Sequence, residues 1–111
     1  MQVKTSLFLV LAIACVGCSE QPPEEPPEPV EPSAGQLIWE GTCKVCHSVG
    51  LAGSPKIGDA KAWAKRIARG KDSLYQHALE GWGDMPAKGG NTQLTDDEVK
   101  QAVDYMVSQS Q

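Results

Sequence analysis

The feature that most constrains this chain is a pair of cysteines two residues apart, followed directly by a histidine: Cys43-Lys44-Val45-Cys46-His47. On a helix the two thiols lie about one turn apart, on the same face. Each thiol can therefore add to one vinyl group of the same porphyrin, and His47 can face the iron. The motif is the covalent attachment sequence of c-type haem. We expect one haem c, bound through Cys43 and Cys46, with His47 as an iron ligand.

Two other chemistries use the same cysteine spacing. A thioredoxin-like redox pair belongs in a βαβ setting, and no run in this chain shows the alternation of a strand. A zinc site needs a second pair of Cys or His ligands, and the only other histidine is His77. The export signal described next favours haem over both.

The first 18 residues predict an export signal. Lys4 precedes an apolar run, residues 7–16, that is too short to span a bilayer as a helix. A small residue directly before Cys18 resembles a bacterial lipobox, although Cys15 stands where leucine is usual. We expect cleavage before Cys18 and a lipid anchor on that cysteine; ordinary signal cleavage near residues 12–14 is the alternative. In either case the protein is expected outside the cytoplasm, in the periplasm.

Residues 19–33 are predicted to form a tether. Six prolines and five glutamates between residues 20 and 32 forbid a helix and leave nothing to bury. A polyproline II chain of this length reaches about 40 Å, enough to hold a domain clear of a membrane surface. Beyond the tether nine acidic residues balance nine basic ones, so no basic surface indicates nucleic-acid binding.

Residues 34–111 are predicted to form one all-α domain of about four helices. Capping residues precede each predicted helix: Ser33 before a helix running toward Cys43, Asp59 before 60–69, Asp72 before 73–80, and Thr95 before the last. The last helix has apolar residues on one face, among them Val99, Val103 and Met106. A domain this small is only marginally stable without a cross-link or a cofactor, so we expect a large apolar cofactor to complete its core.

Three residues are candidates for the second axial position on the iron. Met85 lies in the irregular segment Gly83-Asp84-Met85-Pro86, which can place a thioether over the haem. Met106 lies on the apolar face of the last helix and is expected in the core. His77 lies off the apolar face of its helix and is expected at the surface. Met85 is therefore the predicted ligand, and its soft thioether favours ferrous iron.

Together these residues resemble the bacterial class I cytochromes c, most closely the cytochrome c5 group, over residues 35–108. Gly35, Trp39 and Tyr105 are similar to the positions where the family's first and last helices cross. The resemblance implies that the Pro55 carbonyl accepts from Nδ1–H of His47. It also implies that the Trp63 N–H and the Arg66 guanidinium face the haem propionates. The segment Met85-Pro86-Ala87-Lys88-Gly89-Gly90 is similar to the family's ligand loop.

The resemblance implies a function as well as a fold. It predicts an electron carrier rather than an enzyme, which passes single electrons between redox partner proteins such as membrane respiratory complexes. We expect the domain to be a monomer. A haem that binds peroxide, CO or NO after Met85 dissociates is the alternative. One departure from the family falls at residues 91–94, where many cytochromes c5 have a disulfide and this chain has Asn-Thr-Gln-Leu.

Overall fold

A computed structural model describes residues 28–111; the predicted signal peptide, Cys18 and most of the predicted tether lie outside the described residues. The described part is helical, and its only β pairing is an isolated bridge between Trp82 and Met85. The helices are α1 (Ala34–Ile38), α2 (Lys44–His47), α3 (Ala60–Ile67), α4 (Lys71–Glu80) and α5 (Asp96–Ser108). Because α1 continues into α2, the predicted all-α fold of about four helices is confirmed.

The first helical run contains a π-helical turn. Ser33 caps α1 by accepting from the backbone N–H of Gln36, as predicted. The segment η1 (Trp39–Cys43) then joins α1 to α2 without leaving helical backbone angles at its ends. π turns inside helices are rare and are often found at functional sites. This one places the two cysteines and His47 at the end of the run.

Helix α5 forms the base of the core. Its capping box at Thr95 and Glu98 is complete, and its buried face consists of Val99, Ala102, Val103, Met106 and Val107. Helix α1 packs across α5, where a Cβ on Gly35 would collide with the backbone of Gln101. The Trp39 and Tyr105 rings lie beside this crossing, with centroids 5.7 Å apart.

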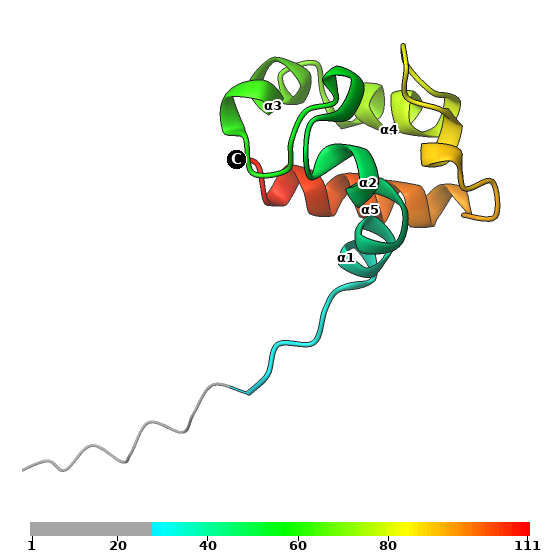
Figure 1. Ribbon diagram of the computed structural model, residues 1–111. Coiled ribbons are helices and arrows are strands. Elements are labelled where there is room, and N and C mark those ends of the chain that lie inside the picture. The colour runs from blue at the N-terminus through cyan, green and yellow to red at the C-terminus, as the bar shows by residue number, and fades with distance from the viewer. Residues whose placement is uncertain (1–27) are drawn as a thin grey trace, which may run out of the picture.

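Helices α3 and α4 follow each other closely (Figure 1). Asp59 caps α3 as predicted, accepting from the N–H of Ala62. The predicted start of α4 was wrong: the helix begins at Lys71, and its N-cap is Gly70. Gly70 has a φ of +91°, which lets the chain reverse direction within one residue. Asp72 instead lies in the first turn, where its charge favours the helix dipole.

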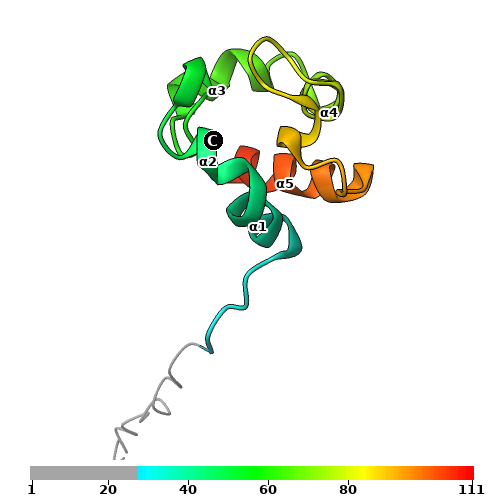
Figure 2. The same ribbon diagram turned by 45° about the vertical axis from the view of Figure 1, so that its right-hand side comes forward.

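The loops complete an open ring of chain above α5 (Figure 2). The loop after α2 returns to the C-terminal end of the chain, where the N–H of Gly58 donates to the buried Ser110 hydroxyl over 2.9 Å. The loop after α4 contains η3 (Ala87–Gly90) and leads into α5. None of the helices between residues 28 and 111 is long and apolar enough to cross a membrane.

Candidate haem-binding site

A cavity of about 590 Å³ lies between these elements. Its volume falls in the range of cofactor and ligand pockets. Cys43, Cys46 and His47 line it from the first helical run, and Met85 and Pro86 from the loop after α4. Its apolar wall is formed by Leu74, Ala78, Val103 and Met106. The cavity therefore joins the attachment motif to the predicted second ligand.

No disulfide joins Cys43 and Cys46. Burial, and secondarily the neighbouring Cys46, raise the pKa of the Cys43 thiol to about 11. Reactive redox cysteines have lowered pKa values, so this pair does not fit a thioredoxin-like site. Residues 28–111 also contain no cluster of three or more His, Cys, Asp or Glu side chains that could hold a metal ion. The pair fits thioether attachment better than either alternative.

His47 is buried, with 6% of its surface exposed. Its Nδ1 lies 2.8 Å from the carbonyl oxygen of Pro55, as the resemblance implies. Because a carbonyl only accepts, Nδ1 donates in this bond, and Nε2 is the ring nitrogen left to bind a metal. The N–H of Ile57 also donates to the carbonyl of His47 over 2.8 Å. These two bonds join the loop after α2 to His47, and the bond to Pro55 fixes the orientation of the imidazole ring.

Met85 ends a tight turn at the cavity. Trp82 and Met85 exchange two backbone hydrogen bonds, each of 3.0 Å. A Cβ on Gly81 would lie 2.9 Å from the Met85 carbonyl oxygen, so only glycine fits where the two backbones approach. Met106 is 3% exposed in the core, as predicted, and also lines the cavity.

His77 was wrongly predicted as a surface residue. It is half-buried and lines the cavity. The chain turns back at Gly81, so the indole of Trp82 stacks on the imidazole with centroids 4.1 Å apart and planes inclined by 22°. The helical pattern of 73–80 gave no sign of this contact, because the covering residue lies beyond the helix. Trp82, which also lines the cavity, was not among the predicted site residues.

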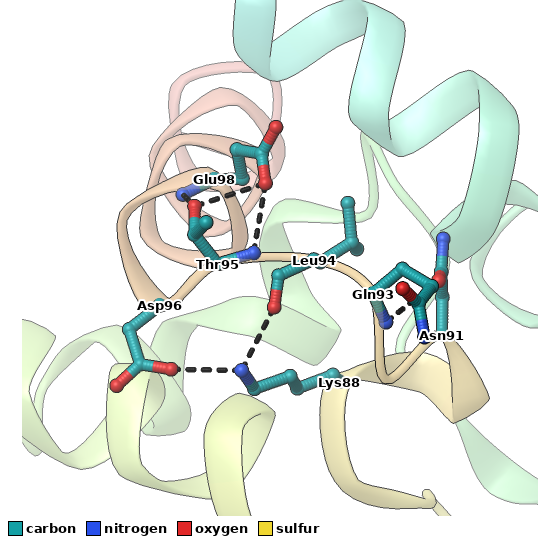
Figure 3. Close-up of polar contacts among 7 residues, drawn as sticks. All are labelled: Lys88, Asn91, Gln93, Leu94, Thr95, Asp96 and Glu98. Atoms are coloured by element: carbon teal, nitrogen blue, oxygen red, sulfur yellow. Dashed lines mark hydrogen bonds and ion pairs between the residues drawn. The ribbon is translucent and has the colours of Figure 1, made fainter.

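Side-chain bonds hold the outer part of the Met85 loop (Figure 3). The ammonium of Lys88 lies 2.8 Å from the carbonyl oxygen of Leu94 and 2.8 Å from a carboxylate oxygen of Asp96. Asn91 accepts from the N–H of Gln93, and its amide donates to the hydroxyl of Thr42 near the attachment motif. Polar contacts thus occupy the segment where many cytochromes c5 have a disulfide and this chain has none.

One edge of the cavity is basic. Arg66, the predicted propionate donor, lines it together with Lys65 and Arg69, which were not predicted. Lys65 and Arg66 lie in the last turn of α3, and Arg69 lies two residues beyond its end, so the cluster of three basic residues within five positions was the signal in the sequence. Trp63 also lines the cavity, but its N–H donates to the carbonyl of Lys56 over 2.8 Å instead of facing a propionate. In this structure its ring forms part of the wall.

These residues fit a haem. Two thiols, an imidazole with a free Nε2 and a thioether share one apolar cavity. Carboxylates buried without partners would be costly, and the basic edge supplies partners for propionates. The two thiols and the imidazole are the groups that the attachment motif requires, and the Met85 side chain lies in the same cavity lining.

The chain is similar to known proteins over the same region. The family described as cytochrome c oxidase, cbb3-type, subunit III matches residues 30–106. Cytochrome c-555 of Chlorobaculum tepidum is 48% identical over 82 residues, covering 70% of this chain and 76% of that protein. Cytochrome c5 of Azotobacter vinelandii is 41% identical over 75 residues, covering 66% of this chain and 90% of that protein.

Solved structures agree with the helical fold. The cytochrome c in a crystal structure of its electron transfer complex with nitrite reductase aligns with a TM-score of 0.68 and 38% identity. The alignment covers 70% of this chain and 95% of that one. A mono-haem ferrocytochrome c from Shewanella putrefaciens aligns with a TM-score of 0.61 and 34% identity, covering 74% of this chain and 100% of that one.

Proposed function

This chain belongs to the class I cytochromes c, and on that premise we propose that it is a periplasmic one-electron carrier whose haem iron is ligated by His47 and Met85. Membership of the family makes it an electron carrier rather than an enzyme, with one haem c attached through Cys43 and Cys46. The observation that supports the ligand pair is that His47 and Met85, far apart in sequence, line the same cavity.

The bound haem supplies a one-electron ferric/ferrous couple. His47, oriented by the Pro55 carbonyl, presents a strengthened nitrogen donor. Met85 presents a soft thioether that favours the ferrous state and raises the reduction potential. The apolar wall excludes water from both donors and disfavours the extra charge of the ferric state. With both axial positions filled, the iron has no place for a substrate.

We further propose that the domain, residues 34–111, is held at a membrane. In this proposal residues 1–18 are removed before Cys18, a lipid is attached to that cysteine, and residues 19–33 serve as the tether. The partners are redox proteins that dock on this monomeric domain. The cytochrome c of the nitrite reductase complex is a precedent for such a partner.

Optical spectra of the holoprotein, produced with haem-maturation machinery, test the ligand pair. We expect a low-spin reduced spectrum that does not respond to CO, and a ferric methionine–iron charge-transfer band. Met85→Ala should abolish the band, and Met106→Leu should keep it. A high-spin spectrum, or one that shifts fully under CO, would mean an open sixth position and would replace the electron carrier with a gas-binding haem.

Fractionation of cells tests the anchor. Wild-type protein should be found with membranes, and Cys18→Ser should not acquire a lipid, as the mass of the mature protein will show. Cys15→Ser, three residues earlier in the signal, is the matched control and should remain lipidated. A wild-type protein of unmodified mass in the soluble periplasmic fraction would contradict the anchor and leave the haem ligation untouched.

A further inference from the structure

An aromatic stack lies at the edge of the haem cavity. His77 is in the last turn of α4, and Trp82 is the second residue after that helix. Their ring centroids are 4.1 Å apart with planes inclined by 22°, so the rings overlap face to face. Trp82 is 63% exposed, so most of its indole faces away from protein atoms, and one ring face packs on the imidazole. Both residues line the cavity.

The stack is joined to the predicted ligand through the backbone. Trp82 donates to and accepts from Met85, closing a turn with only Gly83 and Asp84 between them. Rotation of Trp82 would therefore move Met85 with it. In the described chain, the hydrogen bonds of residues 82–85 stay within this turn. The close approach of Gly81 to the Met85 carbonyl and the stack of Trp82 on His77 are then the contacts that hold the turn on α4.

We propose that His77 is a positioning residue for the sixth haem ligand: by stacking on Trp82 it holds the Trp82–Met85 turn so that Met85 stays in the cavity. This inference rests on the proposed ligation by Met85. An exogenous ligand must displace Met85, and Met85 leaves more easily when the turn that carries it is held less firmly. Removing the stack therefore makes displacement easier.

The test is imidazole binding to the ferric holoprotein, measured by optical titration at fixed pH and ionic strength. His77→Ala removes the stack, and we expect it to bind imidazole about two- to tenfold more tightly, the range that an aromatic pair contributes. His77→Phe keeps an aromatic face and should bind imidazole like the wild type. Val107→Ala is the control: Val107 is 3% exposed in α5 and does not line the cavity. It should unfold more easily without tighter binding of imidazole.

Three results would overturn the inference. Unchanged affinity in His77→Ala would mean that the stack does not restrain Met85. An equal gain in Val107→Ala would mean that general loss of stability is responsible. An equal gain in His77→Phe would mean that a ring nitrogen, and not stacking, is responsible. The spectra of the wild type and Met85→Ala separate these results from failure of the proposed ligation: a wild type without the charge-transfer band, or a Met85→Ala variant that keeps it, would contradict the ligation itself.

Discussion

The ammonium of Lys88 donates to the carbonyl oxygen of Leu94 over 2.8 Å and so bridges the loop that begins at Met85 (Figure 3). The same ammonium is paired with Asp96 at the start of α5. The Lys88 side chain is 24% exposed and that of Asp96 66%, so the bond to the Leu94 carbonyl is the part-buried one and the ion pair faces solvent. It connects the ligand segment to the helix that forms the base of the core.

We expect Lys88→Met to weaken the loop without changing its apolar contacts. The Leu94 carbonyl loses a charged donor, which costs roughly 1–2 kcal/mol of unfolding free energy. The charge-transfer band should disappear at a lower urea concentration than in the wild type. Lys61→Met, at an exposed position on α3, is the control and should leave the transition within about 0.5 kcal/mol. Identical transitions for both variants would show that the bridge adds nothing.

Gly81→Ala and Gly70→Ala form a matched pair. Both glycines have a positive φ, +89° and +91°, so each substitution adds backbone strain of about 1–3 kcal/mol. A Cβ at Gly81 also lies 2.9 Å from the carbonyl oxygen of Met85, whereas a Cβ at Gly70 meets nothing within 4 Å. Both variants should be less stable, but only Gly81→Ala should lose the charge-transfer band and bind CO when reduced. CO binding by both would assign the effect to lost stability.

Acid should weaken the Asp96 contact. A hydrogen bond and ion pair with Lys88 hold the pKa of Asp96 below its ordinary value. A carboxyl whose pKa is lowered by folding stabilises the fold above its unfolded pKa, and that contribution is lost as the pH falls through the folded pKa. Wild type should therefore be more stable than Asp96→Asn at pH 7, and the gap should close at an acid pH well below 3.8, the ordinary pKa of the side chain, where Asp96 is protonated in both states.

Urea unfolding at both pH values measures this gap. Asp97→Asn is the control, because Asp97 lies in the same first turn of α5 without the Lys88 contact. A gap of equal size for both variants would assign the effect to the helix dipole.

The basic edge should raise the reduction potential. Arg69 lines the cavity, and a nearby positive charge opposes the extra charge of ferric iron. Arg69→Gln should lower the midpoint potential on the order of 10–50 mV, because 1 kcal/mol corresponds to about 40 mV for a one-electron couple. Lys100→Gln, on α5 and outside the cavity lining, should change it much less. Redox titration at low ionic strength measures both, and equal shifts would remove any special role for this edge.

Local sequence signals predicted those features that depend on neighbouring residues. The caps at Ser33, Asp59 and Thr95 formed as expected, because a side chain three residues from its backbone partner needs no tertiary contact. The cysteine pair and the Pro55–His47 bond followed from a motif and a family resemblance.

What the sequence did not predict depends on packing between distant segments. Ser110 bonds to Gly58, 52 residues away, and nothing local marks it. The start of α4 was misplaced because its N-cap is Gly70, which has no side chain to accept a capping hydrogen bond and so gives no capping signal in the sequence. His77 was assigned to the surface because its helical face is polar, and only the return of the chain at Gly81 brings Trp82 over it.

The distribution of charge over the fold has a consequence for encounter with a partner. Residues 33–111 contain as many acidic as basic residues, yet α3 and its basic edge lie at one end of the molecule and the acidic first turn of α5 at the other (Figure 1). The side-chain charges of this domain cancel in sum, yet their separation gives the polypeptide an electric dipole, to which the haem would add its own charge. The field of a charged partner orients such a dipole before contact, so the rate of association should depend on the concentration of added salt.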